Sequence, residues 1–382
     1  MKYRKFGKTG WDISVLGFGA MRLPQKPDKP GEVDEEEAIR MLRYAVDNGV
    51  NYFDSAYLYH GGVSEKIVGR AFQDGYRKKV KLVTKLPPRM ADSPEAADKI
   101  LNEQLQKLQT ESLDVYLLHG LNKGSWDHVN EWGVLDWAEK KMAQGKFSHF
   151  GFSFHDEYEV LKEIIDAYDN WTMCQIQYNF MDANYQAGRR GVEYAAGKNL
   201  AIVVMEPLRG GLLTQKTPEP VKEIWTKSPV KRSPAEWGLM WVWNQPEISV
   251  ALSGMSTMDQ LKENIEIAGR AEPGILTTEE LKLIETVKET YHSLRPIPCT
   301  GCGYCMPCPN GVDIPRIFQF YNDAVMYNDM QNGRFRYQMV EIFKEEQRGD
   351  KCIECGACMQ ACPQSIEIID WLKKAHEALI SK

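Results

Sequence analysis

Cysteine is almost absent from most of this sequence. Only Cys174 occurs in the first 298 residues, whereas the other eight of the nine cysteines occur between residues 299 and 362. A secreted disulfide scaffold distributes its cysteines through the fold, so this distribution argues against that class. Clustered cysteines in a reducing compartment more often bind metal than form disulfides. We therefore expect a metal centre in the C-terminal part of the chain.

Long apolar runs and excess positive charge are also missing. No segment offers eighteen uninterrupted apolar residues, and the start MKYRKFGKTGWD lacks the apolar run of a signal peptide. The net charge of −6 gives no basic surface for nucleic acid. We therefore expect a soluble, cytoplasmic protein that binds neither membranes nor nucleic acids. Its 382 residues suffice for one large domain and a small one.

Up to about residue 268, short apolar segments alternate with longer amphipathic stretches. The strand candidates begin at Ser14, Tyr52, Lys81, Leu113, His149, Met173, Ala201 and Ser249. Helix starts are marked by Asp34 and by the pair Ser93-Pro94. Eight apolar strands, each followed by a helix, predict a (β/α)8 TIM barrel. A doubly wound open sheet is the alternative, but GFGAMRLP after the first strand lacks the GxGxxG spacing.

A second region begins near the proline-rich segment RPIP at residues 295–298. Between the two groups of cysteines the pattern is helical, as in IFQFYNDAVMY and FRYQMVEIFKEEQ. We therefore predict a barrel domain at residues 1–290, followed by a small, helix-rich domain at residues 291–382 that contains both groups of cysteines.

Polar residues at three consecutive strand ends form a candidate catalytic group. These residues are Asp54, Tyr59, Lys85 and His119. In a barrel the C-terminal ends of the strands surround one pocket. A tyrosine can protonate a carbonyl oxygen that receives a hydride, if an ammonium beside it lowers its pKa and a carboxylate orients that ammonium. A histidine can polarise the carbonyl. Tyr57 is the local alternative for the acid.

The first 268 residues resemble the aldo-keto reductase family. The segments that carry the resemblance are FGKTGWDISVLGFGAMR, NYFDSAYLYHGGVSEKIVGRAF, LVTKL, LDVYLLH, GFSFHD, QIQYN, EPLRGGLL and SGMSTMDQLKENIEIA. The family's acidic residue, four intervening residues and tyrosine match Asp54 and Tyr59, which favours Tyr59 over Tyr57. The family lysine and histidine match Lys85 and His119. The resemblance implies a barrel that binds NAD or NADP without a Rossmann fold and reduces a small carbonyl substrate.

The resemblance also implies a set of residues that bind the dinucleotide. We predict this role for Gly19, Ala20, Ser153, Gln175, Leu208, Glu263 and Asn264. Two positions depart from the family pattern, since Phe154 replaces an asparagine and Met205 an aromatic residue. The positions that are basic in NADP-preferring members are Gly254, Thr257 and Gln260. A 2′-phosphate would lack its usual cation there, so the choice between NAD and NADP stays open.

The two cysteine runs have the spacing of iron–sulfur sites. The second run is Cys352-x2-Cys355-x2-Cys358-x3-Cys362-Pro363, the spacing of bacterial 4Fe–4S ferredoxins. The first run, Cys299-x2-Cys302-x2-Cys305-x2-Cys308-Pro309, is one residue shorter in its last gap. Two zinc sites with four cysteines each are the alternative. We predict two 4Fe–4S clusters, which makes residues 291–382 a ferredoxin-like iron–sulfur domain.

In two-cluster ferredoxins, the fourth cysteine of one run binds the other cluster. The same crosswise arrangement would give two ligand sets here. One set is Cys299, Cys302, Cys305 and Cys362, and the other is Cys352, Cys355, Cys358 and Cys308.

Two functions agree with these features. The first is an NAD(P)H-dependent carbonyl reductase with an attached electron-transfer domain. The second is an iron–sulfur electron-transfer or redox-sensing protein that uses the barrel as a binding scaffold. A hydride carries two electrons, whereas each cluster passes one, and the sequence shows no flavin fingerprint. We therefore expect a ferredoxin or flavoprotein as a redox partner.

Overall fold

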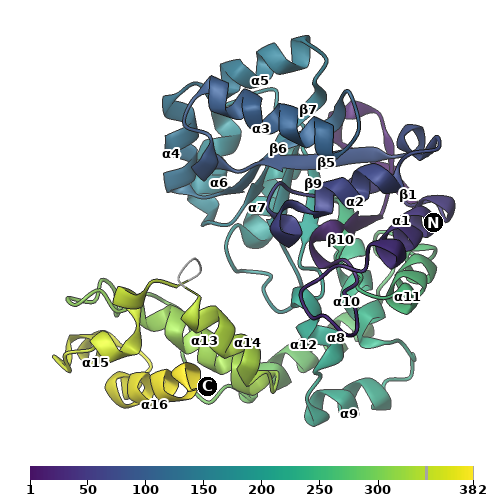
Figure 1. Cartoon of the computed structure of the whole chain (residues 1–382). Helices are drawn as coiled ribbons and strands as arrows, with labels where there is room; N and C mark the ends of the chain where they lie inside the picture. Colours follow the sequence, from purple (N-terminus) through teal and green to yellow (C-terminus); the bar gives the residue numbers. More distant parts are fainter. Residues whose placement is uncertain (340–342, 382) are drawn as a thin grey trace. The chain divides into compact units, whose positions relative to one another are not determined.

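The computed structural model describes residues 1–339 and 343–381, and its main feature is a closed barrel of parallel strands (Figure 1). The order around the barrel is β10-β3-β4-β5-β6-β7-β8-β9. The strands are β3 (Leu16–Gly19), β4 (Tyr52–Asp54), β5 (Lys81–Leu86), β6 (Leu113–Leu121), β7 (Phe147–Phe154), β8 (Met173–Gln177), β9 (Ala201–Met205) and β10 (Ile248–Ser253). All eight predicted strands are confirmed. The open-sheet alternative is wrong, because β10 pairs with β3 and closes the sheet, with Leu252 opposite Gly17.

The amphipathic stretches between the strands form helices on the outside of the barrel (Figure 1). These helices are α1 (Glu35–Asp47), α2 (Ser64–Ala71), α3 (Pro94–Lys107), α4 (Lys123–Glu131), α5 (Val134–Ala143), α6 (Tyr158–Asp166), α7 (Gly188–Gly197), α10 (Pro234–Trp243) and α11 (Met258–Ala268). Both predicted helix starts are confirmed, and each is capped by the side chain before it. The Asp34 side chain accepts a hydrogen bond from the Glu37 amide, and that of Ser93 accepts one from the Ala96 amide.

A short antiparallel hairpin precedes the barrel and was not predicted from the sequence. It consists of β1 (Tyr3–Lys5) and β2 (Asp12–Ser14), which are too short to show a clear alternation of apolar residues. Phe6 and Ile13 of this segment are fully buried and pack with inward-facing barrel residues such as Val115. The hairpin therefore completes the apolar core of the barrel.

The chain divides into two compact units. The first contains Met1–Gly210 and Arg232–Thr278, and the second contains Gly211–Lys231 and Glu279–Lys382. The second unit is helical, with α8 (Leu212–Gln215), α9 (Glu219–Lys227), α12 (Thr278–Ser293), α13 (Ile314–Met326), α14 (Met330–Gln338), α15 (Ala357–Ala361) and α16 (Ile368–Ile380). The predicted domain boundary at residues 290/291 falls within α12, and it stays a prediction.

The second unit has an apolar core of its own. Ile317 and Phe320 of α13 pack there with Leu372 and Leu379 of α16, and six of the eight clustered cysteines border this core. Asn322 is buried on the same helix and joins it to the segment before the first cysteine run. Its side-chain nitrogen donates to the Ile297 carbonyl at 2.9 Å, and its oxygen accepts from the Ile297 amide at 3.0 Å.

We expect Asn322→Leu to destabilise this unit by about 2–3 kcal/mol, because both polar groups of Ile297 lose their partner in a buried place. Differential scanning calorimetry of the cluster-loaded chain should show a transition lowered by several degrees. Replacing Gln331, an exposed amide on α14, by leucine is the control and should leave the transition in place. An unchanged transition in Asn322→Leu would contradict the role of this bond pair.

Among residues 1–339 and 343–381, no helix combines the length and the apolar character needed to cross a membrane.

Candidate active site and cysteine clusters

The four predicted catalytic residues come together at the C-terminal ends of β4, β5 and β6. Asp54 ends β4, Lys85 lies near the end of β5, His119 lies in β6, and Tyr59 begins a short 3-10 helix, η3 (Tyr59–Gly62). The Lys85 ammonium is 2.5 Å from Oδ1 of Asp54 and 3.3 Å from the Tyr59 hydroxyl. The Tyr59 and His119 rings meet edge to face, with centroids 5.7 Å apart. Parallel strands make this convergence possible, since their carboxyl ends share one rim.

The ion pair of Asp54 and Lys85 is buried, and each residue is at most 2% exposed. Burial alone lowers the pKa of Lys85, but the Asp54 charge and hydrogen bond raise it above its ordinary value. The ammonium also donates to the Ser55 carbonyl at 2.7 Å. Lys85 is therefore held charged and in one position beside the tyrosine.

Tyr59 keeps its proton in this site. Burial raises the pKa of its phenol, and although Lys85 lowers it, the pKa remains above the ordinary value. The effect of Lys85 on the pKa of Tyr59 has the direction expected from the sequence, but burial acts in the opposite direction. A protonated phenol beside an ammonium is a proton donor whose phenolate product is stabilised in place.

Tyr57 points to a different partner. Its hydroxyl donates to the Glu103 carboxylate on α3 at 2.8 Å. Since the Lys85 ammonium contacts Tyr59 and not Tyr57, the geometry favours Tyr59 as the acid.

His119 is neutral in this environment. Burial lowers its pKa to about 3, and the charges of Lys85 and His155 act in the same direction. A neutral imidazole next to Tyr59 can donate one hydrogen bond to a carbonyl oxygen without adding a charge.

Gln175 and Ser153 form the predicted nicotinamide end of the site. The Gln175 side-chain nitrogen donates to Oδ2 of Asp54 at 2.6 Å and to the Tyr52 hydroxyl at 3.3 Å. Its oxygen is buried and has no hydrogen-bond partner among the described residues. The Ser153 hydroxyl, also buried, accepts from the Gly120 amide at 2.7 Å. An orphaned acceptor beside the Asp54 carboxylate fits the amide group of a nicotinamide.

Tyr52 was missed by sequence reasoning, although it lies two residues before Asp54 and shares its inward-facing side of β4. Phe154, which replaces the family's asparagine, offers no amide, and its ring is fully buried and packs edge-on against Phe152. Ser153 and Gln175 are buried polar residues of β7 and β8, and their role in holding the carboxamide stays a prediction.

The remaining predicted cofactor residues lie on neighbouring parts of the rim. Gly19 ends β3 and Ala20 directly follows it, Leu208 follows β9, and Glu263 and Asn264 lie on α11 after β10. These three strands are adjacent, since β10 pairs with both β3 and β9. The Asn264 amide is buried and donates to the Ser253 hydroxyl at 3.1 Å, whereas Glu263 is exposed. Their role in cofactor binding stays a prediction.

The cysteine runs approach each other across the second unit. Four cysteines from both runs line one hollow with apolar neighbours, and they are Cys308, Cys352, Cys355 and Cys358. This group is one of the two crosswise ligand sets. Burial raises the pKa of the Cys299 thiol, and the nearby thiols of Cys302 and Cys362, from the other set, raise it further. The donor set and its hollow fit the predicted clusters, and the ligand pairing stays a prediction.

Within residues 1–339 and 343–381, no three His, Cys, Asp or Glu side chains converge as ligands of a single metal ion.

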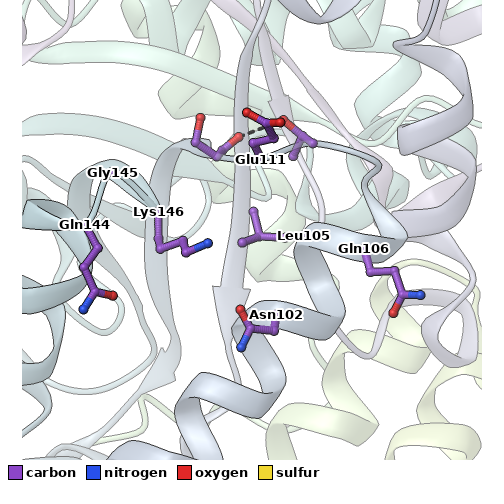
Figure 2. Close-up of a pocket in the computed structure, with 9 residues that line it drawn as sticks. Asn102, Leu105, Gln106, Glu111, Gln144, Gly145 and Lys146 are labelled. Atoms are coloured by element: carbon purple, nitrogen blue, oxygen red, sulfur yellow. Dashed lines mark hydrogen bonds between the residues drawn. The ribbon is translucent and has the colours of Figure 1, made fainter.

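A separate surface hollow of about 600 Å³ lies at the other end of the barrel (Figure 2). It is lined by the C-terminal part of α3 and by the residues directly before β6 and β7, namely Asn102, Leu105, Gln106, Thr110, Glu111, Ser112, Gln144, Gly145 and Lys146. These are the N-terminal ends of the strands, which in such barrels serve stability rather than catalysis. We therefore assign no chemistry to this hollow.

A comparison with protein families bears on the barrel directly. Residues 15–289 match the model of the aldo/keto reductase family. The chain belongs to the aldo/keto reductase family. Residues 298–367 match the model of the 4Fe-4S dicluster domain, so this aldo/keto reductase carries an iron–sulfur domain after its barrel.

Curated relatives of this aldo/keto reductase align along the barrel. The chain is 27% identical over 329 residues to the uncharacterized oxidoreductase YqkF of Bacillus subtilis, covering 77% of this chain and 100% of that protein. It is 25% identical over 312 residues to L-galactose dehydrogenase of Arabidopsis thaliana, covering 77% and 96%. These relatives indicate an oxidoreductase.

Solved structures show the same fold. The holo form of aldo-keto reductase AKR11C1 from Bacillus halodurans aligns with a TM-score of 0.64 and 27% identity, covering 75% of this chain and 96% of that one. An aldo-keto reductase from Klebsiella pneumoniae in complex with NADPH aligns with a TM-score of 0.60 and 22% identity, covering 75% and 95%. The second likeness concerns the fold alone.

Proposed function

We propose that the barrel reduces a small carbonyl compound with NADH or NADPH and that the C-terminal domain transfers electrons through two 4Fe–4S clusters. The observation that carries the first part is the Lys85 ammonium, placed between the Asp54 carboxylate and the Tyr59 hydroxyl. The orphaned oxygen of Gln175 beside this group supports a nicotinamide as the cofactor. The name of one relative, L-galactose dehydrogenase of Arabidopsis thaliana, agrees with this reaction class.

Each residue of the candidate catalytic group would have one role in the reduction. The bound nicotinamide would supply a hydride to the carbonyl carbon. Tyr59 would donate the proton that the carbonyl oxygen then requires, so that the C=O double bond becomes an alcohol. Lys85 would stabilise the phenolate left behind, and Asp54 would hold Lys85 in place. His119 would donate a hydrogen bond to the same oxygen and orient it.

The nicotinamide end of the site would be held by two side chains. The Gln175 oxygen would accept a hydrogen bond from the carboxamide nitrogen, and the Ser153 hydroxyl would donate one to the carboxamide oxygen. Because Gln175 also bonds to Asp54, the carboxamide and the catalytic group share one support. This link would keep the hydride-carrying ring at a constant distance from Tyr59.

The clusters would move single electrons on a different path. The cysteine thiolates of the second unit would hold them, and each cluster would pass one electron at a time. Since a hydride carries two electrons, we propose a ferredoxin or flavoprotein as the redox partner of this domain.

Replacing Tyr59 by phenylalanine tests the reductase proposal. We expect kcat for carbonyl reduction to fall by about 10²- to 10⁴-fold, because the general acid is lost while the nucleotide contacts stay. Anaerobic stopped-flow absorbance with NADPH, NADH and a panel of aldehydes and ketones measures this rate. The nucleotide Kd should change little.

The matched control is Tyr57→Phe, which removes a nearby hydroxyl that bonds to Glu103 instead of Lys85. This variant should retain near wild-type turnover. Equal losses in both variants would contradict the assignment of the acid. Absence of nucleotide binding to the wild-type chain, with clusters reduced only by a protein partner, would favour the electron-transfer function with the barrel as a scaffold.

A further inference from the structure

Arg22 occupies an unexpected place on the catalytic rim of the barrel. It ends η2 (Ala20–Arg22), the 3-10 turn that directly follows β3. Its side chain reaches the segments that follow β10 and β9. A β-carbon added to Gly254, just after β10, would lie 3.1–3.2 Å from the aliphatic carbons of Arg22. One added to Gly210, after β9, would lie 2.9 Å from its Nη2.

The two glycines are part of this arrangement. Because neither carries a side chain, the stem of Arg22 rests on the backbone at Gly254 and its guanidinium on that at Gly210. Gly210 also has a φ of +66°, a conformation that residues with a side chain adopt only with strain. The Arg22 backbone is held as well, since the Ser256 hydroxyl donates to the Arg22 carbonyl at 3.1 Å.

The guanidinium of Arg22 has no anionic partner in the protein. It is exposed, and no hydrogen bond or ion pair to it occurs among residues 1–339 and 343–381. Most arginines of the barrel behave differently. Arg70, for example, pairs with Glu35, and Arg190 with Glu159. A positioned arginine without a carboxylate leaves five donors available to an anionic ligand.

Arg22 supplies a positive charge near the loop after β10, where the sequence has no basic residue at the expected positions. The loop after β10 has no basic residue at Gly254, Thr257 or Gln260, the positions that are basic in NADP-preferring members of the family. The structure brings a cation to Gly254 from the end of β3, more than 200 residues earlier in the chain. The predicted cofactor residues Ala20 and Leu208 lie within two residues of Arg22 and Gly210 in the sequence.

We propose that Arg22 binds a phosphate group of the dinucleotide cofactor. This inference rests on the proposed function, since it assumes that the barrel binds NAD(P)H. A guanidinium fits phosphate oxygens in pairs, and such charge-assisted bonds are stronger than neutral ones. Both the diphosphate, which NADH and NADPH share, and the 2′-phosphate of NADPH offer these oxygens.

The test compares nucleotide binding to the full chain and its variants. Arg22→Met keeps the aliphatic stem and removes the charge, whereas Arg22→Lys keeps a charge without the planar donor pair. We expect the Kd of NADPH, which carries both kinds of phosphate, to rise about 10- to 100-fold in Arg22→Met and less in Arg22→Lys. Quenching of tryptophan fluorescence during titration with NADPH and with NADH measures both values.

Arg190→Met, an exposed arginine on α7, is the control and should leave both Kd values unchanged. Equal loss for NADH and NADPH assigns Arg22 to the diphosphate, and loss for NADPH alone assigns it to the 2′-phosphate. The salt dependence of binding should also weaken in Arg22→Met. Unchanged Kd values in Arg22→Met overturn this inference alone, whereas a wild-type chain that binds neither nucleotide overturns the proposed function.

Discussion

Lys85→Met is expected to abolish carbonyl reduction and to destabilise the barrel by about 3–5 kcal/mol, because it leaves the Asp54 carboxylate buried without a cation. Both side chains are almost fully buried, and the 2.5 Å contact between them is supported by the Gln175 bond to the other carboxylate oxygen. Urea unfolding followed by tryptophan fluorescence measures the change in stability, and stopped-flow kinetics measures the loss of rate.

A double-mutant cycle separates the structural from the catalytic effect. Asp54→Asn removes the stranded charge, so the Lys85→Met/Asp54→Asn chain should regain at least about 1 kcal/mol relative to Lys85→Met. Its activity should not return, because Tyr59 still lacks the ammonium that stabilises its phenolate. A Lys85→Met protein as stable as the wild type would show that the ion pair contributes little to folding.

Cys308→Ser and Cys352→Ser are expected to remove the same cluster. Each variant should lower the iron content from about eight to about four atoms per chain, as measured after anaerobic purification with sulfide analysis. The physical reason is that Cys308 shares its hollow with Cys352, Cys355 and Cys358, although it belongs to the other run.

Pairs of substitutions distinguish crosswise from sequential ligand sets. Under crosswise pairing, Cys308→Ser/Cys352→Ser retains about four irons, and Cys308→Ser/Cys362→Ser retains almost none. Under sequential pairing both double variants should retain almost no iron, because Cys308 then belongs to one cluster and Cys352 and Cys362 to the other, so the Cys308→Ser/Cys352→Ser variant decides between the two arrangements. Cys174→Ser is the control, since burial raises the pKa of that thiol to about 12 and the residue lies in β8, outside the cysteine runs.

Most of the barrel and of its candidate catalytic group could be predicted from the sequence, because the signals that mark them are local. Strands buried on both faces are mostly apolar, so the segment LVTKL is predicted to be a strand. Lys85 is conspicuous in it because a charged residue is unusual in such a strand. The capping residues Asp34 and Ser93 are equally local signals. Cysteine spacing is local too, and it indicated the 4Fe-4S dicluster domain.

Contacts between distant segments could not be read in this way. The closure of β10 on β3, the bond of Gln175 to Asp54 and the seat of Arg22 on Gly254 join residues more than 100 positions apart. The net pKa of Tyr59 likewise depends on burial, which no local pattern reports. The pattern of apolar strands and the spacing of the cysteines were therefore sufficient to predict the fold class, the polar residues at the strand ends and the two cysteine runs. The folded chain alone decided which side chains meet, because packing brings together residues that the sequence keeps apart.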